Sequence, residues 1–388
     1  MIKYCLGVDV SKNDLHCCIC VIDQIQRVTV KGSRKFANNK EGFKELDLWL
    51  RKQHKEPSVP LVVVMEATGI YYEQLAFYLF KSGYSVSVVL PNKAKKYLQA
   101  TGIKSKNDKI DAQGLARMGA EQCLDLWQPM DTFFYELRTL TRQHQNLQEL
   151  KTSLGNQQHA LEFGMYESKQ VAQQLKTLIT TIEKQVAAME ASIDKHIRSN
   201  SDVSQSVDNI CQIKGVGLLT VAVVLAETNG FTLFKNSRQL VSYAGYDVVE
   251  NQSGNHRGRT RISKKGNSRI RRALHLPAFN VIRYEQTPFI GLFQRTLEKH
   301  GQKMKSYVAV QKKLLVLVYT IWKHNKPYQL NYKRSKYTGE KEQVLTSLHA
   351  LGKADAEKES SAKDGATQGK HTVEISQFAS SLQSQIYD

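Results

Sequence analysis

The sequence lacks the features of a membrane or secreted protein. No apolar run is long enough to span a bilayer, and no signal peptide opens the chain. The six cysteines show no paired metal-ligand spacing, and Cys17, Cys18 and Cys20 fall within one apolar, strand-like run. Such cysteines are most simply small buried hydrophobic residues in a reducing compartment. The sequence therefore predicts a cytoplasmic protein.

Acidic residues are also scarce. The 388 residues contain 36 Asp and Glu against 55 Lys and Arg, which gives a formal net charge of +19. Residues 341–388 are slightly acidic, so the rest of the chain is more basic still. This balance favours a polyanionic partner, most simply nucleic acid, although a merely soluble basic protein has the same composition. A chain of this length can form two or three domains.

The apolar pattern predicts an α/β domain over residues 1–128. Its element order is βββαβαβ, followed by a helix that begins near residue 108. The first three strands form an antiparallel meander, and the β-branched fourth is typical of a buried central strand. The predicted strands are residues 3–10, 15–23, 27–33, 59–67 and 84–91, and the predicted helices are 38–53 and 71–83.

The rest of the chain divides into three predicted segments. Residues 129–205 form two long helices, because four leucines recur every seven residues and a second apolar series follows at spacings of three and four. They make a coiled-coil hairpin or a seam between protomers, with an ordinary helical bundle as the alternative. Residues 206–332 form a small, mainly α domain, closed by an apolar helix at 306–324. Residues 333–388, poor in large apolar side chains, form a disordered tail.

Four carboxylates stand out in the first domain. Asp9 lies in the first strand, Glu66 ends the fourth, and Asp108 and Asp111 lie three apart on one helix face. If the first and fourth strands are neighbours, all four converge, and their repulsion calls for divalent cations such as Mg²⁺. Two such ions can activate a nucleophile and stabilise the leaving oxygen of a phosphodiester.

Each carboxylate also has an ordinary interpretation. Asp9 could cap a turn, Glu66 could pair with a lysine, and Asp108 and Asp111 could be an N-cap and a first-turn acid. The element order and the stretch "GVDVSK" also suit a sugar kinase or actin-like ATPase, but a later Gly-rich phosphate loop of the needed kind is missing. Taken together, the four acids in a basic chain favour a metal-dependent nuclease-like site.

The C-terminal half carries two candidate phosphate-binding segments. Lys214, Gly215 and Gly217 form a turn between two apolar stretches, as in a helix-hairpin-helix unit, although any helix–helix turn can use glycine. The second segment is strongly basic and contains few acids, so phosphate binding is favoured over a merely solvated face. Its candidate residues are Arg257, Arg259, Arg261, Lys264, Lys265, Arg269, Arg271 and Arg272.

Four stretches in the correct order resemble the DEDD transposases of the IS110 family, which are similar to Piv/MooV-type DNA invertases. These stretches are "YCLGVDVSK", "VVMEATGIYY", "LPNKAKKYLQATGIKSKNDKIDAQGLA" and "GRTRISKKGNSRIRRAL", and the resemblance covers about residues 1–330. It implies a RuvC-like first domain of the RNase H fold. It also places Asp9, Glu66, Asp108 and Asp111 on the metal-binding tetrad of the family.

The resemblance further implies that Ser253, next to Gly254, is the catalytic serine. Many members of the family have two serines and two glycines here and a proline shortly upstream. This chain has "QSGN" instead, with Asp247-Val248-Val249 before it. Ser253 is therefore the one serine in the motif, and the sequence of the loop around it departs from the family pattern.

The resemblance implies a transposase or site-specific recombinase that forms a serine–DNA intermediate, with two Mg²⁺ ions, or Mn²⁺, at the tetrad. The implied partners are donor and target DNA, a structured bridge RNA as guide, and further copies of the chain, as a dimer or a synaptic tetramer. The implied location is the prokaryotic cytoplasm, at the nucleoid. The alternatives are a RuvC-like nuclease or Holliday junction resolvase, which needs no Ser253, and an inactive nucleic-acid-binding relative.

Overall fold

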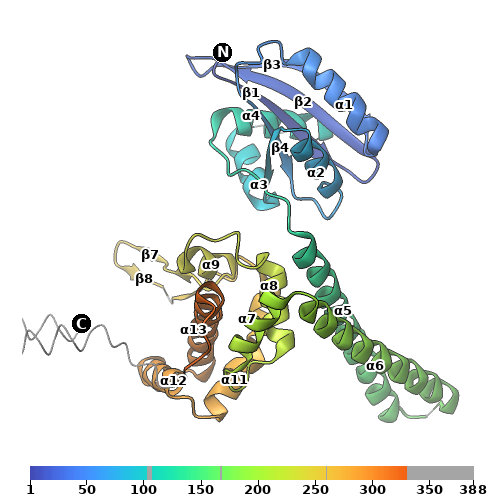
Figure 1. Ribbon diagram of the computed structural model, residues 1–388, viewed down its shortest axis with the longest axis vertical. Helices are drawn as coiled ribbons and strands as arrows, with labels where there is room; N and C mark the ends of the chain where they lie inside the picture. The colour runs from blue at the N-terminus through green and yellow to red at the C-terminus, as the bar shows by residue number, and fades with distance from the viewer. Residues whose placement is uncertain (103–106, 167, 259, 330–388) are drawn as a thin grey trace, which may run out of the picture. The chain divides into compact units, whose positions relative to one another are not determined.

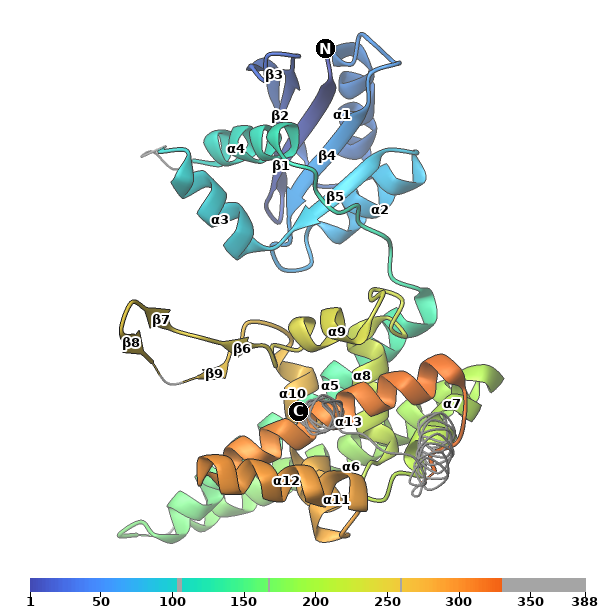
Figure 2. The same ribbon diagram turned by 90° about the vertical axis from the view of Figure 1, so that its left-hand side faces the viewer.

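The computed structural model of the chain describes residues 1–102, 107–166, 168–258 and 260–329 (Figure 1 and Figure 2). The predicted tail at 333–388 lies outside the described residues. Among the helices that are described, none combines the length and hydropathy needed to cross a membrane.

The described chain divides into two compact units. The first unit comprises residues 1–204 and 217–273, and the second comprises residues 205–216 and the segment from 274 onward. The N-terminal sheet, the two long helices and the basic segment all belong to the first unit.

A five-stranded mixed sheet with the order β3-β2-β1-β4-β5 forms the centre of the N-terminal region. Strands β1, β2 and β3 are antiparallel neighbours, whereas β4 is parallel to both β1 and β5. The predicted meander is confirmed, and the first and fourth strands are neighbours, which is the condition on which the convergence of the carboxylates depends. The strands are β1 (Lys3–Val10), β2 (Asp14–Ile22), β3 (Val28–Ala37), β4 (Leu61–Glu66) and β5 (Ser85–Val89).

Helices cover both faces of this sheet. Helices α1 and α2 pack on one face through a cluster that includes Leu6, Phe43 and Leu75, and α4 packs on the other face with Cys5 and Val64. The helices of this region are α1 (Lys40–Gln53), α2 (Glu73–Lys81), α3 (Pro91–Ala100) and α4 (Asp108–Glu121).

Helix α3 was not predicted from the sequence. Pro91 reads as the end of the fifth strand, but in the structure it begins α3. Proline is well suited to the first helical position, because the N–H that it lacks would have no partner there in any case. The prediction that the six cysteines are buried is confirmed for Cys5, Cys17, Cys18 and Cys20, whereas Cys123 is exposed and Cys211 is half-buried.

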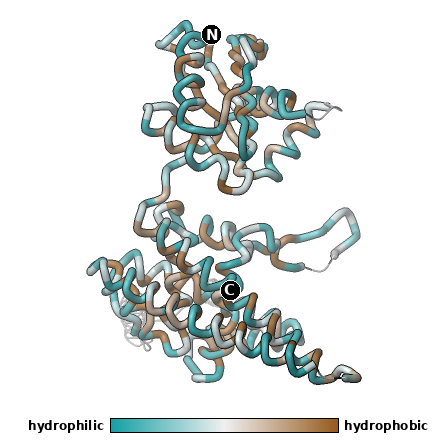
Figure 3. Tube along the Cα trace, turned by 90° about the vertical axis from the view of Figure 1, so that its right-hand side faces the viewer, coloured by the Kyte–Doolittle hydropathy of each residue, from teal (hydrophilic) through white to brown (hydrophobic). Residues whose placement is uncertain are grey.

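Two long helices, α5 (Thr132–Glu162) and α6 (Lys169–Arg198), pack side by side as an antiparallel hairpin (Figure 1). Apolar and polar residues alternate along them (Figure 3). Leu175, Val186 and Ile193 of α6 are buried, whereas the heptad leucines of α5 are half-buried. The predicted pair of long helices is confirmed. A coiled coil in the strict sense, and a seam between protomers, both stay predictions.

The segment after α6 is mainly helical, as expected, but it also contains two short antiparallel ladders, β6–β9 and β7–β8, that were not predicted. Its helices are α7 (Ser201–Cys211), α8 (Leu218–Thr228), α9 (Ser237–Tyr243), α10 (Ser268–Ala273), α11 (His275–Arg283), α12 (Thr287–His300) and α13 (Lys303–His324). Helix α13 contributes Leu314, Leu315 and Val318 to the core, so the prediction of an apolar closing helix is confirmed.

The contact between α4 and the sheet is unusually close. A Cβ atom at Gly7 of β1 would overlap the backbone of Ala112 and Ala116, and one at Gly119 of α4 would overlap the side chain of Cys5. Glycine at both positions therefore allows the helix backbone to lie almost on β1. This approach fixes the position of α4 along the strand.

We expect Gly7→Ala to lower the melting temperature and to cost about 1–3 kcal/mol or more of stability, because the added methyl group meets backbone that cannot rotate away. The matched control is Gly155→Ala in α5, where an added Cβ meets nothing within 4 Å. That change should be neutral or stabilise the protein by up to about 1 kcal/mol, since alanine is the better helix former. Equal melting temperatures for the two variants would contradict the close packing.

Candidate functional site

The alternation of side chains along β1 and β4 brings two of the predicted carboxylates together. Cys5 and Gly7 of β1 and Val64 of β4 lie on the face covered by α4. Asp9 and Glu66 lie two residues further along the same strands, so they share that face. The two strands are parallel and in register, with Gly7 beside Val64, which places Asp9 and Glu66 at the same end of the sheet.

Helix α4 supplies the other two carboxylates. Its N-cap is Asn107, whose side chain accepts a backbone N–H of the first turn at 2.8 Å, and Asp108 and Asp111 follow in that turn. The N-cap expected as one ordinary role for Asp108 is thus held by its neighbour. Because Ala112 packs on Gly7, the first turn of α4 lies close to the strand end that carries Asp9.

Asp9 lies close enough to the other three carboxylates to be influenced by their charges. Burial is the largest cause, and together with the negative charges of Asp108, Asp111 and Glu66 it raises the pKa of Asp9 to about 6, whereas His16 acts in the opposite direction. The structure therefore places Asp9 within electrostatic reach of the other three predicted carboxylates. An excess of negative charge at one half-buried position is the situation in which a bound cation is favoured.

The donor set fits a hard divalent cation. Carboxylate oxygens are the ligands that Mg²⁺ and Mn²⁺ prefer. One ligand atom from each of Asp9, His16 and Asp108 lies within 4.8 Å of the others. The Asp108 side chain is 64% exposed, so both an ion and a phosphate group can reach it from solvent.

His16 is a member of this site that the sequence analysis missed. It lies on β2 directly opposite Asp9, and its Nδ1 atom is 3.4 Å from Oδ2 of Asp108. The tight connection between the first two strands, which pairs Val10 with Leu15, was the available signal. Register counted outward from that connection pairs the next two residues, Asp9 and His16.

Ser253 lies on a separate element, the exposed hairpin β7 (Gln252–Ser253) and β8 (His256–Arg257). Ser253 pairs with His256, and Gly254 between them has a φ of +54°, a left-handed conformation that glycine adopts without strain. A second ladder, β6 (Val248–Val249) with β9 (Arg261–Ile262), continues toward the base of the hairpin. The hairpin extends away from α9 (Figure 2).

The predicted basic residues fall into two groups. Arg261, Lys264 and Lys265 are exposed along the hairpin and the loop after it. The other three described side chains have partners within the protein: Arg269 pairs with Glu227, Arg271 donates to the carbonyl of Ala244, and Arg272 pairs with Glu149. Arg259 and the side chain of Arg257 lie outside the described parts of the chain.

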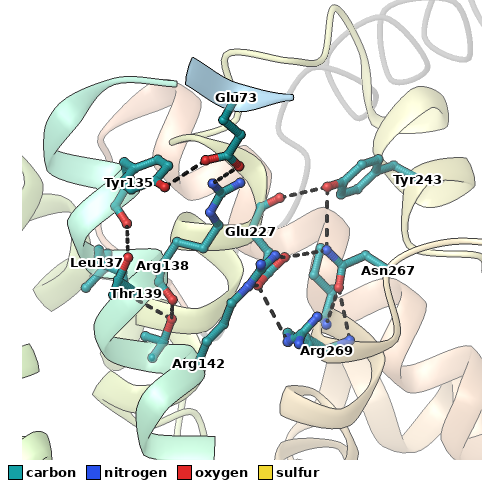
Figure 4. A network of polar contacts seen from close by, with 12 residues as sticks. Glu73, Tyr135, Leu137, Arg138, Thr139, Arg142, Glu227, Tyr243, Asn267 and Arg269 are labelled. Atoms are coloured by element: carbon teal, nitrogen blue, oxygen red, sulfur yellow. Dashed lines mark hydrogen bonds and ion pairs between the residues drawn. The ribbon is translucent and has the colours of Figure 1, made fainter. Parts of the chain in front are cut away.

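A polar cluster around Glu227 joins the basic segment to the long helices (Figure 4). Glu227 of α8 is only 4% exposed and accepts hydrogen bonds from Arg142 of α5 at 2.7 and 3.0 Å and from Asn267 at 2.7 Å. The backbone carbonyl of Glu227 accepts the hydroxyl of Tyr243 at 3.0 Å. Burial alone would raise the pKa of Glu227, but the donors from Arg142 and Asn267 lower it, so this carboxylate is held ionised.

The glycine turn predicted to bind phosphate lies between α7 and α8. Gly215 has a φ of +97°, and Gly217 is the N-cap of α8. The Lys214 side chain is exposed, while its backbone carbonyl accepts a hydrogen bond from Gln286. The turn therefore has the backbone conformation that needs glycine, and its contact with nucleic acid stays a prediction.

We expect Glu227→Ala to destabilise the protein by about 3–5 kcal/mol, because it leaves the half-buried Arg142 guanidinium without its carboxylate. Thermal unfolding followed by circular dichroism measures the loss. Glu149→Ala is the matched control. It removes a carboxylate of α5 that pairs with Arg272, but this carboxylate is exposed, so the change should alter the melting temperature little. A Glu227→Ala protein as stable as the control would show that Arg142 is solvated without Glu227.

Two transposase families match this chain, one in its N-terminal half and one further along. Residues 6–162, which span the sheet, α4 and helix α5, match the DEDD transposase family of IS110 elements, described as "Transposase". Residues 207–291, which include the glycine turn and the Ser253 hairpin, match the family described as "Transposase IS116/IS110/IS902 family". Together the two matches cover more than half of the chain.

Two similar proteins align with this chain over nearly the whole of their own length. The pilin gene-inverting protein of Moraxella bovis is 28% identical over 84% of this chain and 98% of its own length. The transposase for insertion sequence element IS1111A of Coxiella burnetii is 21% identical over 84% of this chain and 91% of its own. Among solved structures, T. thermophilus RuvC in complex with a Holliday junction substrate matches 30% of this chain and 93% of its own, at 12% identity and a TM-score of 0.25. The chain belongs to the IS110 family of transposases.

Proposed function

We propose that this chain is the transposase of an insertion sequence and that it cuts and rejoins DNA strands through a serine–DNA intermediate. The observation that supports this most directly is the convergence of Asp9, Glu66, Asp108 and Asp111 at one end of the sheet, in a chain of this family. The Moraxella relative is named for inverting a gene, which is a DNA rearrangement of the same class.

The tetrad holds the divalent cations, two Mg²⁺ ions or Mn²⁺. When bound, the ions neutralise charge on a DNA phosphate and polarise its P–O bonds. The chain contributes the geometry: β1 and β4 hold Asp9 and Glu66 at a fixed separation, and the capped first turn of α4 orients Asp108 and Asp111. These carboxylates are mounted on regular elements, so little rearrangement is needed when the phosphate arrives.

Ser253 supplies the nucleophile. Its Oγ attacks the scissile phosphorus, the Oγ–P bond forms, and the P–O bond of the DNA strand breaks, with the hydroxyl proton passing to the departing strand oxygen. Attack by a new strand hydroxyl reverses these bonds and releases the serine. Gly254 lets the backbone approach DNA closely, and Arg257, Arg259 and Arg261 offset the charge that develops on the phosphate.

The partners in this proposal are donor DNA, target DNA and a structured bridge RNA that guides the enzyme. The net charge of +19 suits polyanionic partners of this kind. Lys214, Lys264 and Lys265, whose side chains are exposed, bind phosphate backbone without reading sequence. The helical hairpin α5–α6 joins protomers into a dimer or a synaptic tetramer, and the site of action is the prokaryotic nucleoid.

Four matched substitutions test the tetrad: Asp9→Asn, Glu66→Gln, Asp108→Asn and Asp111→Asn. Each should reduce recombination in an excision assay by at least about 100-fold, since even the outer partners of metal sites contribute about 10–100-fold. Circular dichroism should show an unchanged fold. Asp14→Asn is the control, because Asp14 lies at the same end of the sheet but pairs with Lys35. If Asp111→Asn recombined at the wild-type rate while the other three variants were inactive, the metal site would consist of three carboxylates.

Ser253→Ala tests the covalent step. The variant should bind DNA normally yet form no protein–DNA adduct under denaturing electrophoresis, because alanine offers no nucleophile. Ser153→Ala, which makes the same change at an exposed position of α5, should form the adduct as the wild type does. Strand exchange by Ser253→Ala would instead favour a metal-dependent nuclease or junction resolvase that uses water. Binding without any cleavage by the wild type would indicate an inactive relative.

A further inference from the structure

The carboxylate cluster contains an imidazole whose position is set by the sheet. In the antiparallel pair of β1 and β2, His16 is the direct partner of Asp9. Directly opposed residues point to the same face with their Cβ atoms about 4.5–5.5 Å apart. Further along the same two strands, Cys5 faces Cys20 and Gly7 faces Cys18, under α4. His16 thus lies near the N-terminal end of β2, on the face that carries the tetrad.

The distances around His16 match the span of a single bound ion. Ligand bonds of about 2.1 Å in an octahedron place adjacent ligand atoms about 3 Å apart and opposite ones about 4.2 Å apart. Nδ1 of His16 lies 3.4 Å from Oδ2 of Asp108. With Asp9 included, the three ligand atoms lie within 4.8 Å of one another. A small movement of side chains would place all three around one cation.

The charged neighbour of His16 on β3 already has another partner, so the carboxylates are the charged groups beside the His16 ring. Lys35 of β3, its neighbour on the other side, has its ammonium group 3.1 Å from Asp14, so that charge is already paired. The His16 side chain is 24% exposed, which keeps solvent access to the ring limited but real. The simpler alternative is that His16 only pairs with Asp108 and holds it in place.

We propose that His16 is a nitrogen ligand of the metal centre and that it tunes which metal the site accepts. This rests on the proposed binding of a divalent cation by the tetrad. Imidazole is a softer ligand than carboxylate or water and suits first-row transition ions better than Mg²⁺. A site with four carboxylates and one imidazole should therefore bind Mn²⁺ with an advantage over Mg²⁺ that the carboxylates alone do not give.

Pulsed electron paramagnetic resonance of the full chain loaded with Mn²⁺ tests this directly, because a coordinated imidazole nitrogen modulates the electron spin echo. The wild type should show nitrogen modulation, and His16→Asn, which offers an amide oxygen near the position of Nδ1, should lose it. His159→Asn is the matched control, since His159 is exposed on α5, and it should keep the wild-type signal.

Binding titrations supply the second measurement. His16→Asn should bind Mn²⁺ at least about tenfold more weakly, as is common for residues that support a metal site, and should bind Mg²⁺ with nearly unchanged affinity. If His16→Asn does not fold by circular dichroism, His16→Gln is measured in its place.

The outcomes separate this inference from the function on which it rests. If the wild type binds no Mn²⁺, both the proposed metal centre and the role of His16 are wrong. If Mn²⁺ binds without nitrogen modulation, or if the modulation persists in His16→Asn, the metal centre stands and His16 is not a ligand. An equal loss of Mn²⁺ and Mg²⁺ affinity would show that His16 only positions Asp108.

Discussion

The close approach of α4 to β1 is the contact on which the candidate metal centre depends. Gly7 and Gly119 have no side chains, so the helix backbone lies against the strand, and Ala112 packs where a Cβ on Gly7 would otherwise be. The helix therefore has one position along the strand. From that position its first turn carries Asp108 to the strand end that bears Asp9. A helix held further from the sheet by larger side chains would separate these carboxylates.

The negative charges at Glu227 and at Asp9 have different surroundings. At Glu227 the protein provides the compensation itself, through the guanidinium of Arg142 and the amide of Asn267, and the buried carboxylate is held ionised. At Asp9 the nearest charged groups are mostly other acids, and the pKa rises to about 6. The first arrangement is complete within the protein, whereas the second favours an added cation. This difference distinguishes a structural ion pair from a candidate metal centre.

The hairpin that carries Ser253 combines an exposed tip with an anchored base. At the base, Ser263 donates its N–H to Asp247 and Lys264 donates its N–H to Gly245, at 2.7 and 3.1 Å. Asn267, just after this base, donates to Glu227, and Glu227 in turn binds Arg142 of the long helix α5. The tip thus consists of short ladders with exposed side chains, while its attachment is continuous with the polar cluster in Figure 4. The exposed tip is therefore carried on an anchored support.

Local pattern alone determined much of this protein. A continuous β-branched run predicted the strand that bears Glu66, and helical spacing put Asp108 and Asp111 on one helix face; both signals lie in neighbouring residues. The tertiary structure decided the rest. Pro91 begins a helix instead of ending a strand, His16 joins the site through strand register, and Arg142 pairs with Glu227, 85 residues along the chain. These pairings depend on packing between distant segments, and the free energy of such contacts is absent from any local stretch of sequence.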